Sequence, residues 1–356
     1  MKKNPKWKIV LNLILLLLIL GIMFYFIQNS MREIFVELKE TNLVILLGVI
    51  FLGLLHQFFE GYGIKETVGS FAPNFSVFDG MMTSFYTAFY RVVTFGVGTL
   101  LAEIGFYKKK GIKISQGVGA SALHMISYKA AIVTYAVLNL FFYFNAILNQ
   151  RPKMIAVIIT GIVLTVLLIV TLIVLSLSLN LQVLVLLFCN RFIRNQKLRV
   201  YIDQFNLQIN ALHHAMQSVL NDRTSLLKIY LFNLLKVGAW YVIPFVCLQE
   251  EFNDIDFFLT FALISFTLVV SGVIPSPAGI GSFDFVYLLM FRPLSGTVDA
   301  VSSLLLYRFA SYVLPFLLGF LVFLKERRTA ITTEIENSSQ IQLLIFDQFR
   351  PMSYTS

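Results

Sequence analysis

Ionisable side chains inside apolar stretches are the residues of this sequence whose types could do chemistry. They are Arg91, Glu103, Lys129, Asp284 and Arg308. A charge at the centre of a lone membrane helix costs about 2.5 to 3.5 kcal/mol, so such residues face a bundle interior and find a partner there. Two hypotheses stay open. Either Arg308 pairs with Asp284, and Arg91 with Glu103 or Glu60, or the two arginines bind a phosphate group.

Helix-breaking residues accompany these charges at two places. The first cluster follows Arg91 and contains Thr94, Gly96 and Gly98. The second cluster precedes Asp284 and contains Pro275, Pro277, Gly279 and Gly281. Proline lacks a backbone donor and glycine favours turns, so we expect helices to stop at both clusters. Irregular backbone at membrane depth survives only inside protein or beside a water-filled space, so the two clusters predict a cavity.

Such a cavity would favour an anion. A helix N-terminus carries about half a positive unit charge and exposes backbone amides, and both features favour phosphate. We expect His124, by contrast, to be a packed core histidine. The sequence therefore predicts a binding site for a lipid headgroup, formed by Arg91, Thr94, Gly96, Gly98, Glu103, Lys129, Pro275, Pro277, Gly279, Gly281, Asp284 and Arg308.

Sequence signatures of catalysis and of metal binding do not occur in the chain. It contains no His-x4-Asp, Gly-x-Ser-x-Gly or multi-aspartate motif, and it has only four histidines. Cys189 and Cys247 are expected near opposite membrane faces, which gives them no redox or metal role. We therefore expect no catalytic residue, no metal ion and no cofactor.

Composition excludes a soluble protein. Of the 356 residues, 58% are hydrophobic and 13% are charged, whereas about a quarter of the residues in a soluble domain are charged. The net charge of +9 comes from basic clusters that flank apolar segments. This distribution indicates membrane orientation and gives no reason to expect a nucleic-acid partner.

The apolar segments predict an all-α polytopic membrane protein. We expect six full transmembrane helices, at residues 7–27, 43–59, 119–144, 154–177, 231–247 and 300–324. Basic loops place both termini in the cytoplasm, so residues 78–106 and 257–292 must each enter and leave on one side. These would be two re-entrant or broken elements that face opposite sides, as in an inverted repeat. A plain eight-span bundle is the alternative.

Two segments are expected outside the membrane. Residues 180–228 are basic and carry apolar residues at helical spacing, which predicts an amphipathic helix on the cytoplasmic surface. Residues 325–356 would form a cytoplasmic tail after a transmembrane domain of residues 1–324. The segment and the tail could anchor a separate cytoplasmic enzyme, which is a further hypothesis for function.

Three runs of sequence resemble the bacterial lysylphosphatidylglycerol synthase transmembrane family, which includes the N-terminal flippase half of the multiple peptide resistance factor. The runs are RVVTFGVGTLLAEIGFYKKKGI at residues 91–112, VIPSPAGIGSFDF at 273–285 and LYRFASYVLPFLLG at 306–319. The resemblance covers roughly residues 11–324. Two positions depart from the family pattern, because Ala278 replaces a glycine and Asp284 replaces a glutamate.

The resemblance implies lipid translocation between the leaflets of the bacterial plasma membrane, with membrane phospholipid headgroups as partners. In the family the best example is lysylphosphatidylglycerol, whose added charge lowers the attraction of cationic antimicrobial peptides. The family label of phosphatidylglycerol lysyltransferase belongs to a soluble synthase domain, and residues 325–356 are too few for one. We therefore expect no enzyme activity from this chain alone, and a role in lipid lysylation would need a separate synthase. Headgroup, driving force and oligomeric state stay open.

Overall fold

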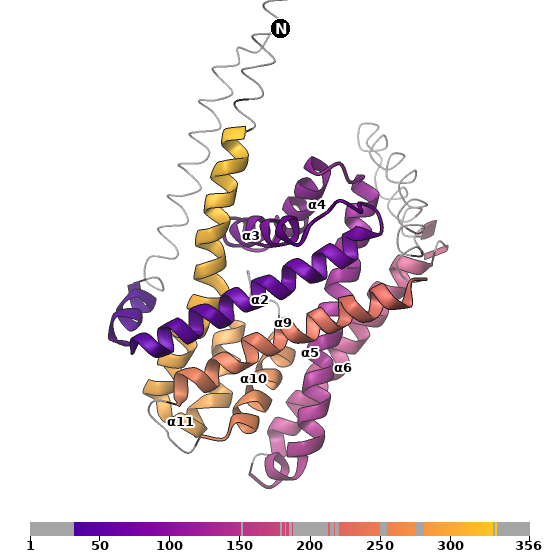
Figure 1. Ribbon diagram of the computed structural model, residues 1–356. Coiled ribbons are helices and arrows are strands. Elements are labelled where there is room, and N and C mark those ends of the chain that lie inside the picture. The colour runs from indigo at the N-terminus through magenta and orange to yellow at the C-terminus, as the bar shows by residue number, and fades with distance from the viewer. Residues whose placement is uncertain are drawn as a thin grey trace, which may run out of the picture.

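The computed structural model describes residues 32–150, 152–178, 221–249, 255–274, 276 and 281–329, with scattered single positions between 180 and 217 and residue 332. In this part of the chain every regular element is a helix (Figure 1). The expected first span, nearly all of the amphipathic segment before residue 221 and nearly all of the tail lie outside it. Those three expectations stay predictions.

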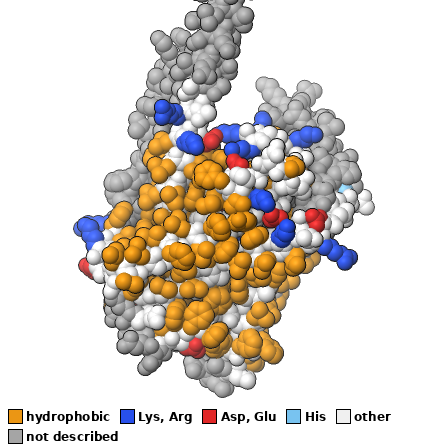
Figure 2. Space-filling view, in the orientation of Figure 1, with side chains coloured by type: hydrophobic (Ala, Val, Ile, Leu, Met, Phe, Trp, Pro, Cys, Tyr) orange, Lys and Arg blue, Asp and Glu red, His pale blue; other side chains and the backbone are white. Residues whose placement is uncertain are grey.

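Five helical stretches of the described residues are long and apolar enough to cross a membrane. They are α2 (Leu43–Gly69), α5 (Ile114–Gln150), α6 (Pro152–Leu177), α9 (Arg223–Leu248) and the run Ser282–Thr329. Figure 2 shows apolar side chains over most of one face of the bundle, as a surface in contact with lipid requires. The expected class, an all-α polytopic membrane protein, is confirmed. One boundary differs: α9 already begins at Arg223, which the sequence had placed in the amphipathic segment.

The first interrupted element consists of α3 (Val77–Val93) and α4 (Thr99–Lys109). Between them the backbone turns through positive φ at Phe95 (51°) and Gly96 (89°). The Thr94 hydroxyl accepts a hydrogen bond from the Gly98 amide at 2.8 Å and donates to the Tyr90 carbonyl at 2.6 Å. These helices of 17 and 11 residues span about 25 and 16 Å, less than the roughly 30 Å of a bilayer core.

The second interrupted element consists of α10 (Phe257–Ser271) and the start of α11 (Ser282–Arg308). Helix α11 begins directly after Gly281, whose φ of 88° suits glycine alone. The break predicted between residues 275 and 281 therefore lies between two helices. Pro275, Pro277 and Gly279 themselves are outside the described residues.

Helix α11 is a hairpin with two antiparallel arms. Its backbone leaves helical geometry at Gly296 (φ 81°), shortly after Pro293. Tyr287 and Ser303, on opposite sides of this turn, share a hydrogen bond of 3.0 Å between their hydroxyls. The second arm continues through the π-helix η2 (Phe309–Val313) into the helix of residues 314–329.

The element order supports the predicted inverted arrangement. In the first half, the long helix α2 is followed by the short helices α3 and α4 around a break and then by the long helix α5. In the second half, the long helix α9 is followed by the short helix α10, the break, the short first arm of α11, and the long second arm with its continuation. The first long helices, α2 and α9, pack antiparallel, since His56 stacks on Trp240 at 3.6 Å and Gly63 approaches Asn233. Figure 1 shows α3 and α4 near one end of the bundle and α10 and α11 near the other.

Candidate anion-binding cavity between the interrupted helices

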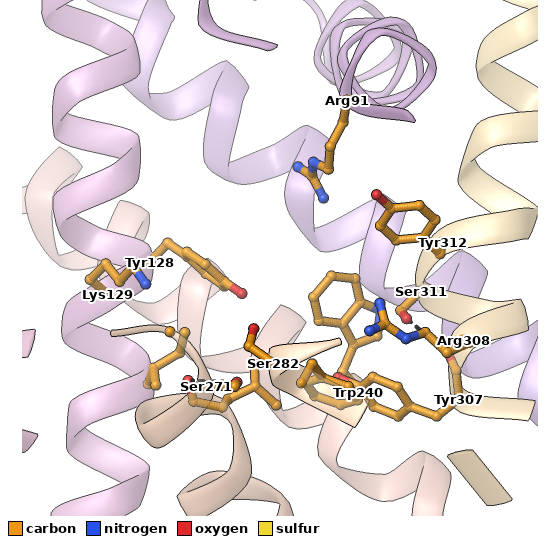
Figure 3. A pocket seen from close by; sticks show the side chains of 14 residues that line it. Arg91, Tyr128, Lys129, Trp240, Ser271, Ser282, Tyr307, Arg308, Ser311 and Tyr312 are labelled. Atoms are coloured by element: carbon orange, nitrogen blue, oxygen red, sulfur yellow. Dashed lines mark hydrogen bonds between the residues drawn. The ribbon is translucent and has the colours of Figure 1, made fainter. Parts of the chain in front are cut away.

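A cavity of ≈ 180 Å³ lies between the two interrupted elements. Its lining residues come from α3, α5, α9, α10, α11 and η2, so both halves of the chain contribute. Arg91 reaches it from the last turn of α3, whereas Ser271 and Ser282 come from the end of α10 and the start of α11 (Figure 3). The break of the second element thus opens onto this space.

Three cationic side chains line the cavity: Arg91, Lys129 and Arg308. Arg308 donates from Nε to Asp284 Oδ1 at 2.7 Å, and its guanidinium lies 5.0 Å from the centre of the Phe283 ring. Stacking on an aromatic face and a carboxylate contact hold a guanidinium in one orientation. Arg308 is therefore preorganised at the wall of the cavity.

Lys129 lies against the end of α10. A Cβ atom on Gly272, the C-cap of that helix, would be only 3.1 Å from Lys129 Nζ. The end of a helix carries partial negative charge on its free carbonyls, so it stabilises an ammonium group. The nearest atom to that Cβ would be the Leu268 carbonyl oxygen at 2.9 Å, so the ammonium and the last carbonyls of α10 lie close together at this glycine.

The charges in the cavity do not balance. Its lining contains no carboxylate, and Asp284, beside it, is engaged by Arg308. The ion pairs found among residues 32–150, 152–178, 221–249, 255–274 and 281–329 include neither Arg91 nor Lys129. A net positive, partly buried space of this kind attracts an anion.

Aromatic and hydroxyl groups complete the wall. They are Tyr128, Trp240, Tyr307, Tyr312, Ser271, Ser282 and Ser311. The indole Nε1 of Trp240 is buried and has no hydrogen-bond acceptor within the part of the chain that the structure describes.

The two ion pairs of the pairing hypothesis have different outcomes, and phosphate binding by the arginines stays a prediction. The pair of Asp284 and Arg308 is present, and Asp284 also accepts the Gly281 amide at 2.9 Å, which caps α11. A pair of Arg91 with Glu103 or Glu60 is not found among the described residues. Glu60 instead contacts Lys236 and His124, so His124 is part of a polar cluster and not only a packed core residue.

Of the predicted site residues that the structure describes, Arg91, Lys129 and Arg308 line the cavity, and six do not: Thr94, Gly96, Gly98, Glu103, Gly281 and Asp284. Thr94, Gly96 and Gly98 build the turn between α3 and α4, and Glu103 accepts a hydrogen bond from Tyr107 at 2.8 Å. The sequence analysis missed Lys236, whose side chain is 3% exposed. It is the only charged residue in the apolar stretch 231–247, and that isolation was the available signal.

Comparison with known proteins agrees with the motifs and the fold. No curated protein matches this chain. The family model described as the lysylphosphatidylglycerol synthase TM region matches residues 9–319, which include both interrupted elements and every residue that lines the cavity. The chain therefore belongs to the lysylphosphatidylglycerol synthase transmembrane family and is a multi-pass membrane protein of lipid modification or translocation.

Proposed function

We propose that this protein translocates an anionic phospholipid, or another lipid carrying a phosphate, between the leaflets of the bacterial plasma membrane. The observation that carries this proposal is the excess of positive charge in the cavity between the two interrupted elements. Arg91 and Lys129 face that space without a carboxylate partner among the described residues. A lipid phosphate would supply the missing negative charge.

Phosphate suits the donors at this site. Guanidinium groups bind phosphate oxygens in a bidentate manner, and Arg308 is already oriented by Asp284. Helix α11 begins at Ser282, which lines the cavity, so the free amides of its first turn add partial positive charge. Half-helices whose N-termini point at an anionic substrate group are a feature of transporters built from inverted repeats.

The size of the cavity favours a headgroup over a whole lipid. A volume of ≈ 180 Å³ is below the roughly 300 to 1,000 Å³ of sites that enclose drug-sized molecules. Acyl chains would therefore stay in the surrounding lipid, along apolar faces such as the one in Figure 2. The headgroup would pass between the elements at the two ends of the bundle as each opens in turn.

The test is a flipping assay with the purified full chain in liposomes. Fluorescent phosphatidylglycerol in the outer leaflet is bleached by an impermeant reductant, and the protein should increase the fraction of lipid that becomes accessible. Arg91→Ala should slow the exchange by about tenfold or more, the factor expected for about 1.4 kcal/mol of lost binding. Arg91 suits this purpose because its removal leaves no carboxylate partner unpaired within the described chain.

The matched control is Arg327→Ala. Arg327 is exposed on the final helix and lies over Phe323, away from the cavity lining. Its loss should leave the rate unchanged. Equal rates for the two variants would show that the cavity is not the site. A chain that accelerates no lipid, whether anionic, aminoacylated or glycosylated, would refute translocation.

A further inference from the structure

A second group of ionisable side chains lies outside the cavity and comes from four helices. We name it the buried charge cluster: Glu60 of α2, Glu103 of α4, His124 of α5 and Lys236 of α9. The first three side chains are 13%, 13% and 14% exposed, and Lys236 is almost fully buried. Removing charges from water costs several kcal/mol per ion, so a cluster of this kind persists only with good partners.

His124 has an unusual pair of neighbours at one ring nitrogen. Its Nε2 lies 3.1 Å from Glu60 Oε2 and 3.0 Å from Lys236 Nζ. An ionised carboxylate only accepts hydrogen bonds, and an ammonium only donates them. When Nε2 carries a proton it can donate to Glu60, and when it carries none it can accept from Lys236. The site therefore offers a partner for both protonation states.

The other polar groups of the cluster keep their partners whether or not Nε2 of His124 carries a proton. Nδ1 of His124 faces Glu103 Oε1 at 3.9 Å, and Tyr107 donates to the same oxygen at 2.8 Å. Lys236 contacts Glu60 directly, whatever the state of the imidazole. With the lysine and both carboxylates ionised, a neutral His124 leaves one excess negative charge. Binding one proton at Nε2 removes that excess.

The cluster is joined to the cavity through two aromatic residues. Lys236 Nζ lies 4.6 Å from the centre of the Tyr128 ring. The backbone carbonyl of Lys236 contacts His56 Nδ1 at 2.8 Å, and His56 stacks on Trp240. Both Tyr128 and Trp240 line the cavity.

Other titratable groups face the cluster from the helices packed around it. They are His56 of α2, Arg91 of α3, Tyr107 of α4 and Tyr128 of α5. The charge of Arg91 acts on Lys236 and His56 as well as on the cavity. An anion bound beside Arg91 would offset that positive charge and would make protonation of the cluster more favourable.

We propose that His124 in the buried charge cluster binds one proton together with the anionic headgroup, so that proton and lipid cross the membrane in the same direction. This inference rests on the proposed translocation. One proton binds at Nε2 of the imidazole on the acidic side and leaves from the same atom on the other side, with no other bond made or broken. Because the coupling is reciprocal, the proton must raise headgroup affinity by the same factor as the headgroup raises proton affinity.

The transport test uses the same liposomes with an acidic exterior. The proton gradient should accelerate inward movement of fluorescent phosphatidylglycerol by at least about fivefold, the lower end of typical coupling factors. A protonophore should abolish this acceleration in the unaltered protein. His124→Gln should abolish it too. Glu326→Gln, which removes a carboxylate from the exposed pair with Lys109, should retain it.

The alternative results separate the two proposals. Translocation that ignores the gradient and the protonophore would overturn proton coupling and leave the proposed function standing. The protonophore result does not depend on any variant, so misfolding of His124→Gln cannot produce it.

A second measurement does not depend on transport. Trp7→Phe leaves Trp240 as the only tryptophan, and its emission should change in one step of a pH titration when His124 binds its proton. His124→Gln should remove this step, and glycerol 1-phosphate should move its midpoint to higher pH. A step that survives in His124→Gln but disappears in His56→Gln would overturn the proposal, because His56 would then be the titrating group. If no lipid is translocated but the His124 step is present, the proposed function fails and the proton site stands.

Discussion

Glu60 and Lys236 form the most deeply buried ion pair of the described residues. A buried pair contributes little to stability relative to an apolar pair of the same shape, but removing one partner leaves the other charged and unpaired. The pairs at the helix ends, such as Lys109 with Glu326 at 2.9 Å, are far more exposed. At the residue scale, the burial of an ion pair therefore determines how much stability is lost when one of its partners is removed.

Lys236→Ala should destabilise the protein by about 3 to 5 kcal/mol, because Glu60 would stay buried without its ammonium partner. Lys109→Ala should cost less than about 1 kcal/mol, because that lysine is 45% exposed. Thermal unfolding of both variants in the same detergent provides the comparison. Similar losses of melting temperature would contradict the assignment of Lys236 as a buried partner.

At the scale of elements, the first interrupted element is positioned by close backbone contacts. A Cβ atom on Gly80 of α3 would lie 2.2 Å from the Gly61 carbonyl oxygen of α2. A Cβ atom on Gly319, in the final helix, would lie 2.0 Å from the Phe85 carbonyl oxygen of α3. Helix α3, which carries Arg91, thus fits between two other helices only because glycines face it.

Gly80→Ala should therefore lower stability by about 1 to 3 kcal/mol or more, since an overpacked contact forces the helices apart. Gly105→Ala on α4 is the matched control, because nothing lies within 4 Å of a Cβ atom there. Alanine is a better helix former than glycine, so this variant should be neutral or stabilised by up to about 1 kcal/mol. The unfolding midpoints of the two variants, measured under the same conditions, test this difference in stability. A Gly80→Ala variant as stable as Gly105→Ala would exclude the close packing of α2 and α3.

How far the sequence could predict these elements depends on the range of the interaction. The turn at Gly96 and the start of α11 at Gly281 follow from local backbone chemistry, and both were predicted. The pair of Asp284 and Arg308 joins two arms of one hairpin and was one of two hypotheses. Lys236 and Glu60 lie on α9 and α2, far apart in the chain, so only tertiary packing brings them together.

At the scale of the whole molecule, the two interrupted elements should be open to opposite sides of the membrane. In a cysteine-free background, Val97→Cys reports on the first break and Ile274→Cys on the second, and both positions are exposed. An impermeant thiol reagent should modify Val97→Cys from the cytoplasmic side and Ile274→Cys from the outside. Lys113→Cys, beside the basic run after α4, is the control for the cytoplasmic side.

Modification of both positions from the same side would contradict the inverted arrangement. The eight-span alternative would then have to be reconsidered, together with a site between the two halves. Modification from opposite sides would also fix the orientation of the cavity between them.

The π-helix η2 determines which side chains of its helix face the cavity and which face α3. Pro315 follows it, and a proline ring would collide with the Ser311 carbonyl in regular α-helical geometry. The π-helical turn contains one residue more than an α-helical turn. The side chains after it are therefore rotated by about 100° around the helix axis. Arg308 can then face the cavity while Gly319 faces α3. Deleting a single residue between positions 309 and 313 would rotate Gly319 away from Phe85, and a bulkier side chain would meet that carbonyl instead.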